Sequence, residues 1–204
     1  MKKGFFVLAL LVGVVFQANA QEKGRFWVGG NFNFLTTDQE DDMKTTSFSV
    51  SPEFGYSFSE RWAAGIRFGY SQTKIDYEGS QSSQKVKNDK FTVAPFARYT
   101  CFTWKRLNLF VDGGLSYARE KGKTEHSNHS DNNTGNYVGI FINPGLSLRL
   151  SNCISMVGYI NFFNAHYQKR NYTSVNYPDS KTYQANLNSP FNLNNFSLGF
   201  NFRF

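Results

Sequence analysis

Strict alternation of apolar and polar residues is the feature that most constrains the fold of this chain. Between residues 47 and 58, every second residue is apolar or aromatic, and the residues between them are mostly small or polar. The same pattern recurs over residues 62–71, 107–117, 138–149 and 195–204. A two-residue period over about ten residues predicts a β-strand with one apolar and one polar face. The sequence therefore predicts an all-β protein.

Three further segments predict weaker strands. They cover residues 25–35, 90–99 and 154–166. The last of these alternates poorly, so the sequence does not fix which of its residues share a face. Three strands contain a proline, which cannot donate to a β-ladder, and we expect a bulge or a missing hydrogen bond at each. These prolines are Pro52, Pro95 and Pro144.

The connections between the eight predicted strands alternate between long and short. The short turns cover residues 59–61, roughly 102–106 and 151–153, and the long connections roughly 36–46, 78–88, 119–136 and 168–190. All long connections therefore lie at one end of the sheet, as in transmembrane barrels, which have long loops on one side and short turns on the other. The pattern predicts an eight-stranded antiparallel up-and-down transmembrane β-barrel.

The N-terminus is typical of a secretory signal peptide. Lys2 and Lys3 precede an apolar run, residues 5–16, that is too short to cross a bilayer as a helix. A small-residue cleavage motif ends at Ala20, so we expect Gln21 to begin the mature chain. The expected organisation is a signal peptide over residues 1–20 and an outer-membrane β-barrel domain over residues 21–204.

Alternation alone does not decide whether the apolar face contacts lipid or the protein interior. A soluble periplasmic lipocalin-like binding barrel also alternates, with its apolar face inward, and stays as the alternative. Two observations favour a transmembrane barrel over a soluble one. The polar face carries few charges, and aromatic residues lie near the strand ends, as in the aromatic belts of membrane barrels. These aromatics are Tyr56, Phe58, Trp62, Tyr99, Phe102 and Trp104 near the turns, and Tyr70, Tyr117 and Tyr137 near the long connections.

The last strand ends the chain on an aromatic residue. Ser197, Gly199, Phe202 and Phe204 resemble the C-terminal assembly signal of outer-membrane barrels. Two further runs, Val93–Tyr99 and Phe110–Tyr117, resemble the central hairpin of the same family. The mature chain as a whole is similar to the outer-membrane β-barrel domain family, of the small porin-like OmpA/OmpX type.

This resemblance implies a location in the outer membrane of a Gram-negative cell envelope. It also implies three partners: outer-membrane lipid, lipopolysaccharide, and the barrel-assembly machinery during biogenesis. It implies no shared activity, because the same fold hosts many functions. We expect a monomer with a structural or surface-interaction role, whose extracellular loops contact a surface ligand that the sequence does not identify.

The net charge of the chain is +7, of which Lys2 and Lys3 contribute two, so the mature chain carries +5. A basic balance raises the question of nucleic acid. The charges of the four long connections cancel, however, because the acidic first connection offsets the basic second and fourth. We therefore expect no nucleic-acid partner.

Charged residues on the polar face of the strands predict a lumen charge network. A charge inside a barrel must pair with its opposite or contact water. Because eight strands leave little open space, we expect the network to fill and fix the lumen. A gate or a narrow ion path is the alternative. Its expected members are Glu53, Arg67, Arg98, Asp112, Arg149 and Arg203.

Signals for catalysis or metal binding are weak. A lipid A-modifying outer-membrane enzyme is an alternative, with His166 and Ser174 as its candidates, but no nucleophile-elbow motif accompanies them. His126 and His129 have no third ligand nearby in the sequence. We expect no enzyme activity, catalytic residue, cofactor or metal. Cys101 and Cys153 both fall near short turns, and the sequence leaves open whether they form a disulfide.

Overall fold

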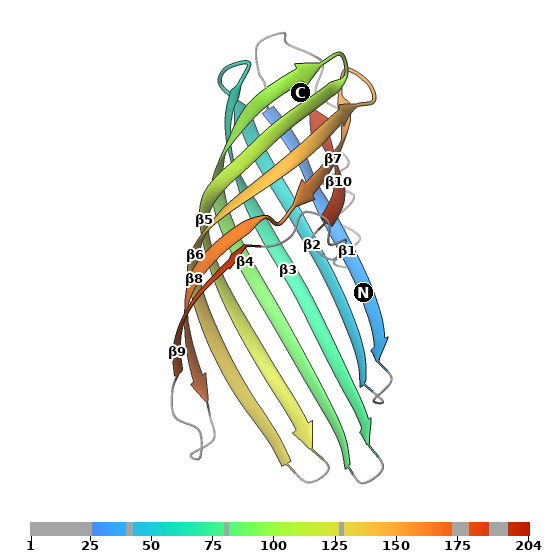
Figure 1. Ribbon diagram of the computed structural model, residues 1–204, viewed down its shortest axis with the longest axis vertical. Helices are drawn as coiled ribbons and strands as arrows, with labels where there is room; N and C mark the ends of the chain where they lie inside the picture. Colours follow the sequence, from blue (N-terminus) through green and yellow to red (C-terminus); the bar gives the residue numbers. More distant parts are fainter. Residues whose placement is uncertain (1–25, 40–42, 80–81, 127–128, 173–179, 188–195) are drawn as a thin grey trace.

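The computed structural model describes residues 26–39, 43–79, 82–126, 129–172, 180–187 and 196–204 (Figure 1). The expected signal peptide and the cleavage position between Ala20 and Gln21 lie outside the described residues. Among the described residues, no helix has the length and hydropathy to cross a membrane. The strands are β1 (Phe26–Gln39), β2 (Met43–Ser57), β3 (Trp62–Gly79), β4 (Ser82–Trp104), β5 (Leu107–His126), β6 (His129–Arg149), β7 (Ile154–Ile160), β8 (Phe163–Tyr172), β9 (Ser180–Leu187) and β10 (Phe196–Arg203).

Eight of these strands close into an antiparallel barrel, as the sequence predicts. The hydrogen-bonded order is β5-β4-β3-β2-β1-β10-β7-β6, and β6 pairs back with β5. The sheet continues beyond this order, since β8 pairs with residues 133–142 of β6 and β9 pairs with β8. Short turns join the strands at the upper end in Figure 1, here called the turn end, and the hairpins of β1–β2, β3–β4 and β5–β6 lie at the lower, hairpin end.

The predicted seventh strand is divided into β7 and β8 by an inserted residue. Tyr159 of β7 pairs with Gly145 of β6, whereas Phe163 of β8 pairs with Ile142. Four steps along one strand therefore match three steps along the other, which is a β-bulge. The extra residue exchanges the inward and outward positions, so β7 buries odd-numbered residues and β8 turns even-numbered residues inward. This explains why no single alternation was visible.

Each of the three prolines interrupts the sheet, as predicted. The paired register skips Pro52 between β2 and β3, Pro95 between β4 and β5, and Pro144 between β6 and the β7–β8 bulge. A proline has no amide hydrogen, so it leaves one rung of the ladder unmade. The barrel accepts these interruptions because each proline keeps its pairing with the strand on its other side.

The long connections predicted from the sequence are wrong in extent, because most of their residues are strand. β3 and β4 remain paired as far as Gly79 and Ser82, and β5 and β6 as far as His126 and His129. The fourth connection contains β9. Beyond the apolar band both faces of these strands are polar, so the apolar-polar alternation that marks a strand in the sequence disappears while the backbone ladder continues.

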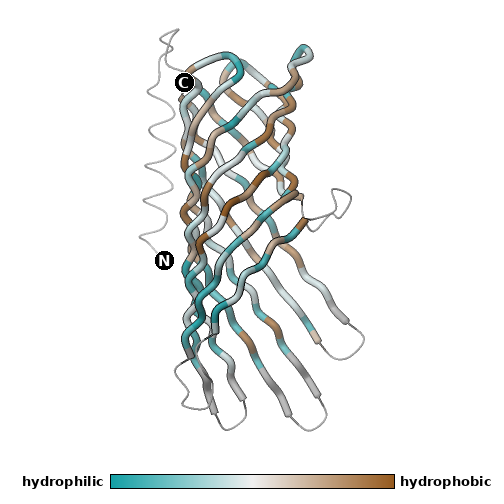
Figure 2. Tube along the Cα trace, turned by 60° about the vertical axis from the view of Figure 1, so that its left-hand side comes forward, coloured by the Kyte–Doolittle hydropathy of each residue, from teal (hydrophilic) through white to brown (hydrophobic). Residues whose placement is uncertain are grey.

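The outward face of the barrel is a continuous apolar band, with aromatic residues along every large hairpin. The predicted apolar faces of the five regular strands do point outward. Figure 2 shows hydrophobic positions recurring through the upper part of the barrel and becoming rarer toward the hairpin end. Exposed members include Phe32 (60%), Phe58 (59%), Phe68 (41%), Phe91 (52%), Leu115 (61%), Ile140 (50%) and Leu198 (45%).

Candidate functional site

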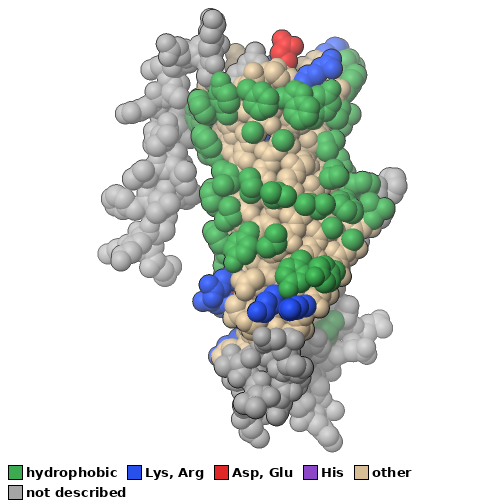
Figure 3. Space-filling model, turned by 90° about the vertical axis from the view of Figure 1, so that its left-hand side faces the viewer, with side chains coloured by type: hydrophobic (Ala, Val, Ile, Leu, Met, Phe, Trp, Pro, Cys, Tyr) green, Lys and Arg blue, Asp and Glu red, His purple; other side chains and the backbone are tan. Residues whose placement is uncertain are grey.

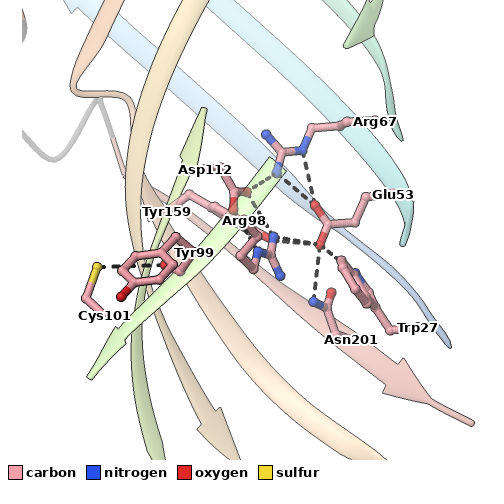
Figure 4. Close-up of polar contacts among 9 residues, drawn as sticks. All are labelled: Trp27, Glu53, Arg67, Arg98, Tyr99, Cys101, Asp112, Tyr159 and Asn201. Carbon is pink, nitrogen blue, oxygen red and sulfur yellow. Dashed lines mark hydrogen bonds and ion pairs between the residues drawn. The ribbon is translucent and has the colours of Figure 1, made fainter. Parts of the chain in front are cut away.

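A cluster of charged and aromatic side chains lies inside the barrel, near the turn end. Glu53 occupies an inward position of β2 because its neighbours Pro52 and Phe54 point outward. The same alternation turns the other members inward from their own strands. Figure 4 shows the side chains converging from different strands. The members are Trp27 of β1, Glu53 of β2, Arg67 of β3, Arg98 of β4, Asp112 of β5, Tyr159 of β7 and Asn201 of β10.

Glu53 is the centre of this cluster. Its Oε1 accepts hydrogen bonds from Tyr159 Oη at 2.7 Å, Asn201 Nδ2 at 3.1 Å and Trp27 Nε1 at 3.2 Å. Its Oε2 accepts from Arg67 Nη2 at 2.8 Å and from Arg67 Nε at 3.2 Å. Charge-assisted and bidentate bonds of this kind fix geometry more strongly than bonds between neutral groups.

Arg98 and Asp112 form the second half of the cluster. Arg98 donates to both Asp112 oxygens, from Nε at 2.7 Å and from Nη2 at 2.9 Å. The two halves are linked because Arg98 Nη2 also lies 3.3 Å from Glu53 Oε1, and Arg67 Nη2 lies 3.0 Å from Asp112 Oδ2. Two guanidinium groups therefore bridge two carboxylates, and their charges balance.

Aromatic rings enclose the two guanidinium groups. The central carbon of Arg98 lies 4.2 Å from the ring centre of Phe110 and 5.1 Å from that of Trp27. That of Arg67 lies 4.8 Å from the Tyr159 ring centre. Cations over ring faces are attracted electrostatically, and more so where water is excluded.

Water has almost no access to this cluster. Asp112 is 0% exposed, and Glu53 is 2% exposed. Every oxygen of both carboxylates accepts at least one hydrogen bond, so no lone carboxylate is presented to a substrate. The arrangement thus supports a role in filling and fixing the lumen, which is the purpose expected for charges paired inside a narrow barrel.

Two of the arginines expected in this network lie apart from it. Arg149 is exposed at the end of β6, and Arg203 is partly exposed at the end of β10. Within the described residues, neither forms an ion pair with a carboxylate. Arg203 pairs with Trp27 of β1, whereas Glu53 pairs with Gly29, two residues farther from the turn end, and Arg149 is the last residue of β6.

Three members of the cluster were not among the expected site residues. Tyr159 was missed because the bulge after β7 hides which way that strand faces. Asn201 lies on the predicted polar face of the last strand, but its side chain is uncharged and the expected network consisted of charged residues. Trp27 lies among exposed phenylalanines of β1, and only its odd position indicates that it points inward.

Glycine is needed beside the cluster at one position. A Cβ built on Gly55 would meet the indole ring of Trp27. We expect Gly55→Ala to lower the free energy of unfolding by about 1–3 kcal/mol, because overpacking forces a buried ring from its place. Gly113→Ala is the control, since the nearest atom to its new Cβ would be 3.9 Å away. Urea unfolding in lipid vesicles measures both, and equal midpoints would contradict the expectation.

A second group of polar side chains lines the interior nearer the hairpin end. Tyr137 Oη donates to Glu120 Oε2 at 2.8 Å, and Arg170 Nη2 lies 3.3 Å from Glu120 Oε1. The ammonium of Lys90 lies 4.5 Å from the Tyr137 ring centre. Tyr137 was expected in the outer aromatic belt, and that expectation is wrong, because its odd position on β6 faces inward.

The weak catalytic and metal signals do not converge in the described residues. The His166 ring lies 5.6 Å from the Tyr137 ring in the interior, not on the lipid-facing side where a lipid A-modifying site was considered, and Ser174 lies outside the described residues. No group of three His, Cys, Asp or Glu side chains in the described part could hold a metal. Cys101 and Cys153 are exposed, and both are free thiols.

The C-terminal residues complete the closure of the barrel. Ser197, Gly199 and Phe202 lie in β10, which pairs with β1 on one side and β7 on the other. The amide of Phe204 donates to the Phe26 carbonyl at 3.0 Å. The pattern that resembles an assembly signal therefore lies in the strand that connects β1 to β7 in the barrel wall.

A comparison with family models decides the family. The model described as "Outer membrane protein beta-barrel domain" matches residues 5–204. The chain belongs to this outer-membrane β-barrel family. The match agrees with the resemblance seen in the sequence and with the closed barrel. None of the curated proteins matches the chain.

Two solved structures resemble this family member in backbone arrangement, at low sequence identity. Ail, the attachment invasion locus protein of Yersinia pestis, is 13% identical, with a TM-score of 0.48, over 89% of this chain and 99% of its own. The outer membrane protein OprG from Pseudomonas aeruginosa is 12% identical, with a TM-score of 0.47, over 89% and 96%. At these values the family model, not the individual structures, carries the assignment.

Proposed function

We propose that this member of the outer-membrane β-barrel family is an integral outer-membrane protein with a structural and surface-interaction role and no catalysis of its own. The barrel spans the bilayer as a monomer, and the hairpins beyond it meet ligands outside the cell. An N-terminal signal peptide directs export, and the barrel-assembly machinery inserts the chain through its last strand.

The observation that carries this proposal is the apolar band on the outside of the barrel. Large apolar side chains that are 40% exposed or more occur on β1 to β6 and on β10. Contiguous apolar surface of this extent is not tolerated in water by monomeric proteins. A soluble lipocalin-like barrel would place these residues inside, whereas here the interior holds the charged cluster.

Two features support a role without catalysis. The two carboxylates of the interior cluster are fully paired, so neither is available as a general base. His166 faces the same interior and contacts Tyr137. The polar hairpins are then the parts of the barrel that are presented to other molecules.

Fractionation tests the proposed location. We expect the protein to sediment with outer membranes, to need detergent for extraction, and to migrate differently on gels before and after boiling, because a folded barrel resists detergent until heated. The lipocalin-like alternative predicts release into the periplasmic fraction without detergent. A periplasmic soluble protein of similar size serves as the control, and co-release with it would overturn the proposal.

A further inference from the structure

Basic side chains gather at both ends of the barrel, on opposite faces of its wall. At the hairpin end they point outward, as Lys87 and Lys123 do, and Figure 3 shows basic side chains directly below the lowest hydrophobic ones. At the turn end, Arg149 and Arg203 instead occupy inward positions of β6 and β10. The inward arginines are not explained by the membrane, because lipid does not reach the interior of a closed barrel.

The strand register places further hydrogen-bond donors beside these two arginines. Ser155 of β7 is directly opposite Arg149, and Ser147 lies one inward position deeper on β6. Asn108 of β5 is directly opposite Ser147, and β10, which ends at Arg203, pairs with β7. These inward side chains therefore come from neighbouring strands at one side of the opening. We call them the mouth cluster, and its members are Asn108, Ser147, Arg149, Ser155 and Arg203.

None of these side chains forms a hydrogen bond or an ion pair within the described part of the chain. Ser147 is 5% exposed and Ser155 is 1% exposed, and the hydroxyl oxygen of each lacks a partner there. The interior carboxylates, Glu53 and Asp112, are bound by other arginines. Buried polar groups normally have partners, so two such hydroxyl groups on adjacent strands indicate that this part of the interior binds a further polar group.

Positive charge accumulates around the mouth cluster. Arg203 is close enough to Arg149 and to the buried Arg98 for their charges to repel it. Charges of one sign around an opening raise the local concentration of ions of the opposite sign. The adjoining turns carry more basic than acidic residues, namely Arg61, Lys105 and Arg106 with Glu60. The opening therefore attracts anions.

The chemistry of the mouth cluster indicates which anion it binds. Guanidinium groups, hydroxyl groups and a side-chain amide all donate hydrogen bonds, and no carboxylate stands among them to attract a cation. A phosphate group offers three or more acceptor oxygens and a charge of about −1.5 to −2 at neutral pH, which two arginines neutralise. A carboxylate has two oxygens and a single charge, so it would leave donors of the cluster unused.

We propose that the mouth cluster binds a phosphate group, either free or in a small soluble ester, inside the turn end of the barrel. Arg149 and Arg203 bind its oxygens from the solvent side, since both are at least partly exposed. Ser147 and Ser155 donate from the buried side, and Asn108 donates from β5. The interior cluster closes the lumen behind the site, so phosphate binds there without crossing the membrane. The opening of the site toward the periplasm rests on the proposed membrane location.

Equilibrium dialysis with radiolabelled inorganic phosphate tests this proposal on the mature barrel folded in neutral detergent micelles. Chloride keeps the ionic strength constant, and the unaltered barrel is expected to bind phosphate saturably. Arg149→Gln combined with Arg203→Gln should weaken binding on the order of tenfold or more, because hydrogen bonds to charged groups are lost. The control, Arg61→Gln with Lys105→Gln, removes the same charge from exposed turn positions and should leave the affinity unchanged.

Ser147→Ala combined with Ser155→Ala separates a specific site from diffuse attraction to positive charge. This variant keeps both arginines, so affinity weaker by about threefold or more would show that the hydroxyl groups bind the ligand. Unchanged affinity overturns the proposal, as does chloride that competes as well as phosphate. The shift in gel mobility on boiling checks that each variant is folded, and the serine variant decides the result if the arginine variant does not fold.

Competing ligands identify the source of the phosphate group. Glycerol phosphate that competes as well as inorganic phosphate supports a small ester as the ligand, whereas competition by inorganic phosphate alone supports the free ion. Acetate that competes equally well overturns the proposal in favour of a carboxylate ligand. A barrel that stays folded without detergent would contradict the proposed location and leave the binding result valid, so the two failures are distinguishable.

Discussion

Arg98→Met is expected to lower the free energy of unfolding by about 3–5 kcal/mol, because it leaves a buried carboxylate without its main partner. Arg98 makes both short bonds to Asp112 and also reaches Glu53. Methionine keeps much of the side-chain volume but supplies no charge. Urea unfolding of the refolded barrel in phospholipid vesicles, followed by tryptophan fluorescence, measures the change.

Two further variants separate the charge effect from general damage. Arg98→Met combined with Asp112→Leu removes one charge of each sign, and should recover most of the loss, because replacing both members of a buried pair by apolar groups is often close to neutral. Arg149→Met is the matched control, since Arg149 is exposed, and surface substitutions usually change stability by less than about 0.5 kcal/mol. A loss for Arg98→Met no greater than the control would show that the cluster does not stabilise the fold.

Ile142→Arg is expected to destabilise the inserted barrel by about 2–4 kcal/mol, because an arginine near the middle of the bilayer must leave water. Ile142 points outward from β6, is 45% exposed, and lies between the two ends of the apolar band. The same vesicle unfolding experiment measures the effect.

Asn132→Arg gives the control for this prediction on the same strand. Asn132 lies ten positions earlier, so it faces the same way, but it is exposed on the hairpin side of the band. We expect little change there, because its surroundings are water and headgroups. Small, equal effects of the two arginines would mean that water, not hydrocarbon, contacts the apolar face.

The parts of the fold that were predicted from the sequence are those that alternate in hydrophobicity. The alternation around Phe54 predicted both a strand and the inward direction of Glu53. It did so because residues that face the bilayer are apolar and residues that face the lumen are polar. Pro52 marked where the ladder is interrupted. Four charged members of the interior cluster followed from the same parity argument, and the structure brings Glu53, Arg67, Arg98 and Asp112 together.

The parts that were missed have a common physical cause. Where both faces of a strand contact water, hydrophobicity no longer reports the strand, so the hairpins around Gly79 and His126 were taken for loops. An extra residue within a strand exchanges its inward and outward positions, so the inward direction of Tyr159 could not be predicted. The clustering of basic side chains on the outward face was also missed, because charges summed over a connection cancel. The strand register instead places Lys87 and Lys123 on one face and Glu120 on the other.

The long paired hairpins affect how a protease or an antibody would bind this protein. Residues 71–79 and 82–90 hold their backbones in one continuous ladder, so an outside molecule meets a shaped ribbon formed by two strands. A protease needs a single extended strand, and must first separate the two. Antibodies that recognise the folded ribbon would likewise fail to bind a synthetic peptide copied from either strand alone, which makes the intact barrel the appropriate immunogen.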